Sequence, residues 1–169
     1  FRLAIKSTET GTANKINFDS SSGKISDGAA KLFGSTQKDE WQSNPISGSK
    51  TDTVNAGIIT INGTNIDTST MSYTKLTEEI NKIGGVQASL VDSSDGKFRL
   101  AIKSTETGTA NKINFNTKDI SGNDLGVSSG AAKLFGDGSA LSDSLNVLKA
   151  QNMQLKADGV DYSSSSNTV

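Results

Sequence analysis

The chain contains one 18-residue segment twice. The segment FRLAIKSTETGTANKINF forms residues 1–18 and is repeated, letter for letter, at residues 98–115. A shorter segment, GAAKLFG, stands at residues 28–34 and again at residues 130–136. Identity over this length indicates an internal duplication, but a solenoid needs about three or more repeats to bury its faces. We therefore expect two related domains.

The second copy is preceded by a predicted hairpin and a predicted helix. Residues 57–67 read GIITINGTNID, and Asn62-Gly63 suits a type I′ hairpin turn because both residues tolerate a positive φ. Ser72 is a suitable N-cap for the helix, and Gly84-Gly85 supply its left-handed stop. Apolar residues at steps of three and four form one stripe of this helix: Tyr73, Leu76, Ile80 and Ile83.

Strands are predicted within and just before the second copy. The segments Val86–Val91 and Phe98–Lys103 flank a polar loop at Asp92–Gly96 and are expected to pair. In the second segment Phe, Leu and Ile alternate with Arg, Ala and Lys, so one face is apolar. The segment Ala110–Phe115 alternates again and is predicted to be a further strand. The fold class indicated is mainly β with short helices.

The duplication suggests two small related domains, one inserted in the other. The second, at 51–136, holds the complete set of predicted elements, whereas the first is discontinuous and comprises 1–50 plus 137–169. Because the first copy begins on what is a strand in the second, we expect the sequence to be a fragment of a longer chain. The strand at Phe1–Lys6 is then expected to lack its native partner, and either to fray or to pair with another chain.

The segment at 35–53 is polar and contains the single Pro and the single Trp of the chain. This composition is typical of a linker or a domain junction. Trp41 has two interpretations. Its ring could pin the segment against a domain, which we favour, or it could be an exposed contact for a partner or a glycan.

Two further elements are predicted after the second copy. In the segment Leu141–Ala150, three leucines at steps of three and four indicate a short helical stripe. The segments Met153–Ala157 and Val160–Ser164 flank Asp158-Gly159, which predicts a second hairpin.

Composition excludes most classes of functional site. Ser, Thr, Asn and Gly make up 73 of the 169 residues, and there is neither Cys nor His. Disulfides, thiolate chemistry, Cys/His zinc sites and histidine-dependent triads are therefore excluded. The formal net charge of −1 argues against a nucleic-acid partner. No apolar run approaches the ~18 residues of a membrane span, so no membrane partner is expected either.

The carboxylates do not indicate a catalytic or metal site. Glu9 and Glu106 occupy equivalent positions in the repeated Thr-Glu-Thr-Gly turn, whereas catalysis needs one preorganised pocket. The segment Asp119–Asp124 has oxygen-rich spacing but lacks the terminal Glu of a calcium loop, so we favour an Asx-rich turn. Asn62-Gly63-Thr64 is a formal glycosylation sequon, which we interpret as the hairpin turn. We expect no catalytic, cofactor-binding or metal-binding residues and no cofactor.

The repeated stretch Lys-Ser-Thr-Glu-Thr-Gly-Thr-Ala-Asn also has two interpretations. It could provide two equivalent binding loops, one in each domain. It could instead be a structural turn between strands, with Thr and Asn side chains that bond the local backbone. We favour the structural turn.

Two parts of the chain resemble a known family. The residues ITINGTNIDTS, LTEEINKI and GVQASLVDSSDGKFRLAIKSTETGTANKI resemble the IN motif of bacterial flagellins and hook-associated proteins. The tail, KAQNMQLKADGVDYSSSSNTV, resembles the segment in which flagellar filament cap proteins return from their head domains. The second motif discriminates toward the cap family, because flagellins share the first. The duplicated copy departs from single-copy members and suggests an extra head domain.

The resemblance implies a structural and assembly protein and not an enzyme, namely the head region of a flagellar filament cap. Such a cap is a ring of identical subunits at the distal tip of the extracellular filament, where it guides flagellin into place. In some bacteria its head domains adhere to host mucus. The partners implied are other copies of the chain, flagellin, and host mucin or glycans. Two alternatives stay open: the variable outer domain of a flagellin, and a secreted carbohydrate-binding adhesin domain.

Overall fold

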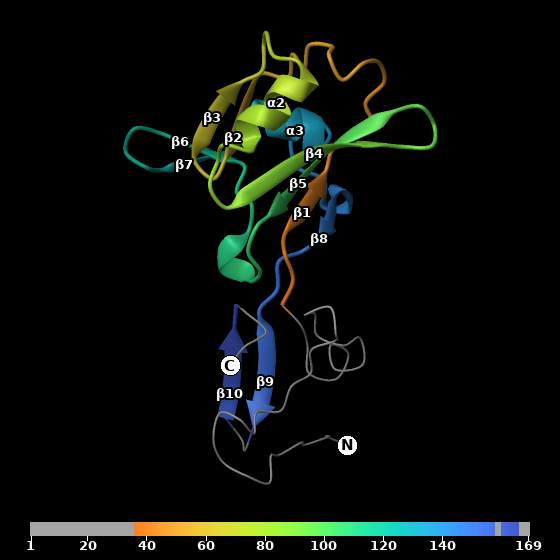
Figure 1. Ribbon diagram of the computed structural model, residues 1–169. Coiled ribbons are helices and arrows are strands. Elements are labelled where there is room, and N and C mark those ends of the chain that lie inside the picture. The colour runs from red at the N-terminus through yellow and green to blue at the C-terminus, as the bar shows by residue number, and fades with distance from the viewer. Residues whose placement is uncertain (1–35, 158–159, 166–169) are drawn as a thin grey trace.

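The computed structural model describes residues 36–157 and 160–165, and in these ranges the predicted fold class, mainly β with short helices, is confirmed (Figure 1). The first copies of both repeated segments, the strand expected at Phe1–Lys6 and the turn at Asp158-Gly159 lie outside these residues. The elements are, in chain order, β1 (Glu40–Gln42), β2 (Ile58–Ile61), β3 (Thr64–Asp67), α2 (Tyr73–Ile80), β4 (Val86–Asp92), β5 (Phe98–Ser104), η2 (Thr109–Asn111), β6 (Asn116–Lys118), β7 (Asp124–Val127), α3 (Ser129–Phe135), η3 (Asp143–Leu145), β8 (Asn146–Leu148), β9 (Met153–Ala157) and β10 (Val160–Ser164).

A four-stranded sheet in the order β4-β5-β1-β8 runs through the body of the molecule (Figure 1). β4 and β5 pair antiparallel along their whole length, as predicted. β1 pairs antiparallel with β5 on one side and with β8 on the other. Phe98, Leu100 and Ile102 of β5 are at most 2% exposed, so the predicted apolar face of this strand is confirmed.

The hairpin and the helix that precede the sheet strands are also confirmed. β2 and β3 pair antiparallel around Asn62 and Gly63, whose φ angles of 50° and 84° are those a type I′ turn requires. α2 begins after Ser72, whose side chain accepts the backbone N–H of Lys75. The helix ends at Ile80, a few residues before the predicted glycine stop.

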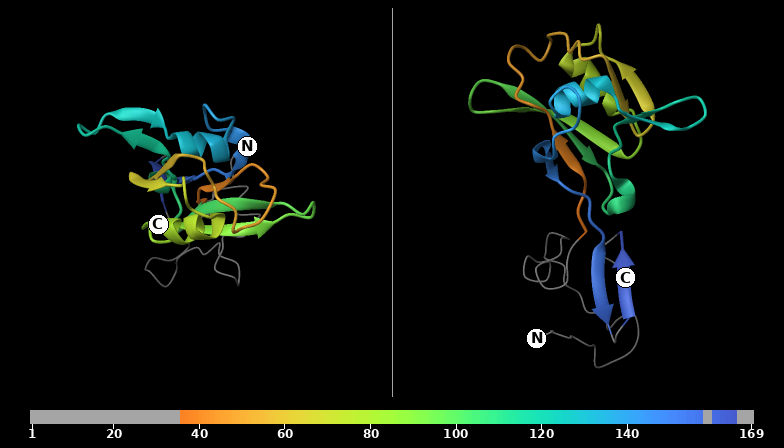
Figure 2. Two further views of the ribbon diagram at one scale, coloured as in Figure 1. Left: turned by 90° about the horizontal axis from the view of Figure 1, so that it is seen from above. Right: turned by 180° about the vertical axis from the view of Figure 1, so that it is seen from behind.

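One apolar core joins these elements to α3. Leu76 and Ile80 of α2 are fully buried, as the helical stripe predicts. α3, which contains the first six residues of the repeated segment GAAKLFG, packs closely on β2. A Cβ atom at Gly130 would lie 2.6 Å from the Ile59 side chain, so only glycine permits this approach. Seen from above, α3 and the β6–β7 hairpin lie on the side of the β2–β3 hairpin away from β4 and β5 (Figure 2).

The prediction of a strand at Ala110–Phe115 is wrong. Residues 109–111 form the 3-10 helix η2, and the residues after it are extended without strand pairing. The backbone N–H of Ile113 donates to the Asp39 carboxylate, and the carbonyl of Phe115 accepts the N–H of Ser128. These two backbone groups of Ile113 and Phe115 are therefore bonded outside any pair of assigned strands. Ile113 and Phe115 are nevertheless buried, because the alternation placed both side chains toward the core.

The predictions for the two segments around the sheet need correction. The segment at 35–53 is not simply a linker, because it contributes β1, an inner strand of the main sheet. The helical stripe expected at Leu141–Ala150 is wrong: η3 gives way to β8, whose backbone groups bond β1. The hairpin strands predicted near the C-terminal end are confirmed as β9 and β10, which pair antiparallel. This hairpin extends away from the body of the molecule (Figure 1).

Strands from both expected domains share the main sheet. β1 and β8 belong to the segments 1–50 and 137–169, whereas β4 and β5 belong to 51–136. A part of the first expected domain lies outside the described residues. The division into a discontinuous first domain and an inserted second domain stays a prediction.

Candidate functional site

Trp41 lies in the core and is 7% exposed. Its ring contacts Phe115 and Phe135 edge-to-face, with centroid distances of 5.5 and 6.5 Å, and those two phenylalanines stack on each other at 5.2 Å. These are the favourable geometries of aromatic pairs. The burial agrees with the interpretation that Trp41 pins its segment to the body. It leaves little of the ring for a partner or a glycan.

A buried carboxylate next to this aromatic cluster bonds three segments of the chain to one another. Asp39 is 2% exposed. Its Oδ2 accepts Trp41 Nε1–H at 3.2 Å and the backbone N–H of Ile113 at 2.9 Å. Its Oδ1 accepts Asn146 Nδ2–H at 3.2 Å and the backbone N–H of Ala150 at 3.4 Å. With both oxygens occupied by donors, this carboxylate is suited to holding the fold and not to chemistry.

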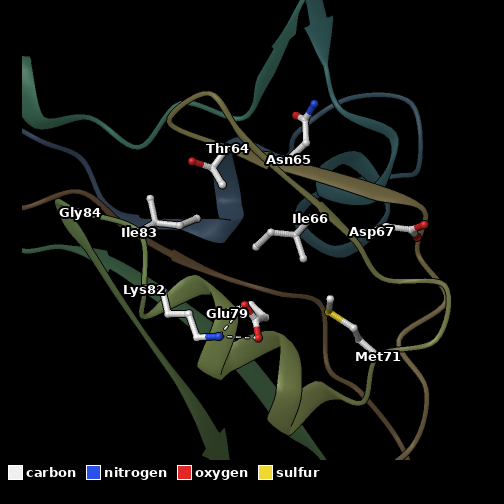
Figure 3. Close-up of a pocket in the computed structure, with 9 residues that line it drawn as sticks. All are labelled: Thr64, Asn65, Ile66, Asp67, Met71, Glu79, Lys82, Ile83 and Gly84. Atoms are coloured by element: carbon white, nitrogen blue, oxygen red, sulfur yellow. Dashed lines mark hydrogen bonds and ion pairs between the residues drawn. The ribbon is translucent and has the colours of Figure 1, made fainter.

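A shallow cavity of about 410 Å³ lies between β3 and the C-terminal part of α2 (Figure 3). Its charged side chains are already engaged. Glu79 forms ion pairs with Lys82 at 2.8 Å and with Lys75 at 3.2 Å. The cavity is lined by Thr64, Asn65, Ile66, Asp67, Met71, Glu79, Lys82, Ile83 and Gly84.

The two acids of this cavity are poorly suited to proton transfer. Hydrogen bonds from Lys82 and then Lys75 lower the pKa of Glu79, and a backbone hydrogen bond from Ser69 lowers the pKa of Asp67. A general acid at neutral pH needs a raised pKa instead. The cavity therefore offers a polar surface without the arrangement of a catalytic site.

The second copy of the repeated turn bonds other parts of the chain, but it leads from β5 into η2 and does not join two strands as expected. Thr107 Oγ1 donates to the carbonyl of Ser165 at 2.6 Å, and the N–H of Gly108 donates to the carbonyl of Gln37 at 3.0 Å. Gly108 has φ 96°, and a Cβ atom there would lie 2.6 Å from Ser165 Cβ. The turn is thus bonded both to the segment before β1 and to the residue that follows β10. Glu106 in this turn is exposed, and its repeat Glu9 lies outside the described residues.

The segment Asp119–Asp124 forms an Asx-rich turn, as predicted. Asp119 accepts the backbone N–H groups of Ser121 and Asn123 at 2.8 and 2.9 Å, and also the Asn123 side-chain N–H at 2.8 Å. These bonds, the one from the Asn123 side chain foremost, lower the pKa of Asp119. In the part of the chain that the structure describes, no group of three or more acidic or metal-ligating side chains could hold a metal ion. Within the same residues no helix is long and apolar enough to cross a membrane.

The sequence patterns did not indicate two side chains, Asp39 and Asn81, that hydrogen-bond backbone groups at or near the sheet. Asp39 precedes a tryptophan in a polar segment, and nothing in that local pattern indicates burial. Asn81 follows α2 and bonds the backbone of Ala88 through its side-chain amide. An Asn after a predicted helix is a possible cap signal, but the contact with a strand depends on tertiary packing.

The comparisons with known proteins agree with the sequence motifs. No family model matches the chain. Two curated relatives, flagellar hook-associated protein 2 of Escherichia coli strain K12 and of Escherichia coli O157:H7, are each 35% identical to it over 91 residues. The match covers 53% of this chain and 18% of each relative, so the chain spans less than a fifth of their length.

Solved structures of flagellar cap proteins share the fold. The D2-D3 domains of FliD from Escherichia coli match at TM-score 0.59 with 21% identity, over 80% of this chain and 71% of that one. The D1-D2-D3 structure from the same organism matches at TM-score 0.57 with 24% identity, over 80% and 41%. The D2-D3 domains from Serratia marcescens match at TM-score 0.55 with 20% identity, over 80% and 75%. The resemblance predicted from the motifs is therefore confirmed: the chain is similar in sequence to flagellar hook-associated protein 2 and has the fold of flagellar cap protein D2-D3 domains.

Proposed function

We propose that this chain is the head region of a flagellar filament cap, and that it acts as a structural and assembly protein through shape and subunit contacts. One observation carries the proposal. A 91-residue sequence match to flagellar hook-associated protein 2 coincides with a fold match, over 80% of the chain, to cap protein D2-D3 domains. Both kinds of comparison lead to the same class of protein.

The chemistry of the described residues supports a non-enzymatic role. The buried carboxylate of Asp39 is occupied by four donors, and Glu79 in the surface cavity is paired with two lysines. Asp39 thus bonds separate segments of the chain to one another, and Glu79 is committed to ion pairs along α2. We therefore propose that the function is contact between proteins.

The proposal places the chain in the extracellular flagellum, at the distal tip of the filament. Its partners are then other subunits of the cap ring and the flagellin that is added beneath it. The division into two nested head domains, 1–50 plus 137–169 and 51–136, belongs to the same proposal. Adhesion to mucin or other glycans stays a prediction, and Trp41, which had a glycan contact as its less favoured interpretation, is buried. The relatives reported above are cap proteins, so we do not propose a flagellin domain or an adhesin.

A chimeric cap tests the proposed function. In an Escherichia coli strain that lacks hook-associated protein 2, the D2-D3 region of that protein is replaced by this chain. We expect filaments and swimming to return, because under the proposal this chain has both the fold and the role of the region that it replaces. The matched control reinserts the native Escherichia coli region through the same junctions. The proposed function is wrong if the control restores filaments but the chimera, although exported and protease-resistant, supports no filament growth.

A further inference from the structure

Among the strands that the structure describes, β4 forms an edge of the main sheet (Figure 1). The backbone of β5 shows which groups of β4 face outward. Leu100 and Ser104 of β5 bond toward β1, through Ser43 N–H and the Asp39 carbonyl. In an antiparallel ladder, backbone groups of alternate residues point to opposite sides. Ile102 therefore also faces β1, and its register partner on β4, Ala88, has its N–H and C=O directed away from β5.

The side chain of Asn81 bonds both of these outward groups. Its Oδ1 accepts the N–H of Ala88 at 2.7 Å, and its Nδ2 donates to the carbonyl of Ala88 at 3.1 Å. An amide that receives one bond and gives one has the same donor and acceptor pattern as a backbone residue of a neighbouring strand. The Asn81 amide thus stands in the position of a fifth strand.

Asn81 is held in place by the end of α2. Its backbone N–H donates to the carbonyl of Thr77 at 3.1 Å, and its backbone is helical with φ −67°. The chain then reaches β4 through a short turn in which Gly85 has φ 83°. The end of α2 and this short turn therefore hold the amide beside β4.

We propose that the Asn81 amide closes the β4 edge and prevents a second copy of this chain from adding its own β4 there. An unpaired edge strand is a template for pairing with another chain. β4 is seven residues long, and its side chains Gln87, Ser89 and Val91 are exposed to solvent. Two copies related by a twofold axis could pair antiparallel through Val86, Ala88 and Leu90.

The experiment compares the self-association of the wild-type chain and Asn81→Ala by sedimentation velocity over a concentration series. We expect Asn81→Ala to associate at least about tenfold more tightly, because it leaves an outward N–H and C=O free to bond a second chain. Adding Gln87→Lys and Ser89→Lys should reverse the gain, since paired β4 strands would bring lysines opposite each other. Asn44→Ala is the matched control, because it removes an amide bond to the carbonyl of Gly136, away from β4.

A measurement on the wild type keeps the proposal testable if Asn81→Ala fails to fold. Hydrogen exchange should be slower at the N–H of Ala88 than at the N–H of Leu90, the next outward group of β4, which no side chain bonds in the described part of the chain. Equal exchange at these two positions would overturn the proposal. So would equal association of wild type and Asn81→Ala, or association that the two lysines do not reverse.

Discussion

Replacing Trp41 by alanine tests whether the polar segment at 35–53 is held by its single aromatic ring. A buried Trp covers about 150–250 Å², which at ~25 cal/mol per Å² corresponds to about 4–6 kcal/mol as an upper estimate. Large aromatic residues in cores cost about 3–5 kcal/mol when truncated to alanine. Because Trp41 is 7% exposed and contacts Phe115 and Phe135, we expect a loss of about 3–5 kcal/mol in the free energy of unfolding.

Trp41→Phe separates the ring from its hydrogen bond. Phenylalanine retains most of the packing but removes the Nε1–H that Asp39 accepts. A hydrogen bond to a charged group contributes about 1.5–3 kcal/mol, so Trp41→Phe should cost less than Trp41→Ala. Both losses are large against the total stability of about 5–15 kcal/mol of a typical domain.

Urea unfolding followed by far-ultraviolet circular dichroism measures these losses without a tryptophan signal. We expect the midpoint to fall in the order wild type, Trp41→Phe, Trp41→Ala, with an unchanged m-value. In the wild type, the emission of Trp41 should be blue-shifted and protected from a soluble quencher. A loss below about 1 kcal/mol for Trp41→Ala, the size of an ordinary surface effect, would refute the reasoning. Quenchable emission at the wavelength of free tryptophan would refute it as well.

Three further predictions concern individual turns and caps. Ser72→Ala should reduce the free energy of unfolding by about 1 kcal/mol, because α2 loses its N-cap bond; an unchanged urea midpoint would contradict this. Gly108→Ala should cost more than Gly63→Ala in the same assay. Both residues have positive φ, but a Cβ at Gly108 would collide with Ser165 while Gly63 has open space; equal losses would contradict the packing argument. Hydrogen bonds from the following turn, backbone N–H groups foremost, lower the pKa of Asp137 from 3.8 to about 2. Its contribution should be complete above about pH 4 and lost as pH falls through about 2, so the stability difference between wild type and Asp137→Asn should shrink over that interval in acid titrations.

Local elements could be predicted because their physical causes are local. Asn62-Gly63 suits a type I′ turn whatever surrounds it, and Ser72 caps the first turn of the helix that follows it. The pairing of β4 with β5 follows from a short polar loop between two alternating segments. Each of these features depends on bonds within a few residues, and each is confirmed.

Predictions failed where a partner distant in sequence decided the conformation. Residues 110–115 alternate like a strand, but their backbone groups bond Asp39 and Ser128 and not a ladder. The leucines of 141–150 are spaced like a helix, but β1 offers an open edge that β8 occupies. β1 itself has three residues in a polar segment, which is too short for alternation to indicate it.

By itself, the sequence determined the duplication, the local turns and helix cap, the absence of Cys and His chemistry, and the motifs shared with flagellar cap proteins. Tertiary structure alone decided that β1 enters the main sheet, that Trp41 is buried, and that the side chains of Asp39 and Asn81 bond backbone groups of other elements. The physical reason is the range of the interactions. Turns and caps satisfy neighbouring backbone groups, whereas a buried carboxylate or a strand-edge amide is stable only when folding brings its partners within hydrogen-bond distance.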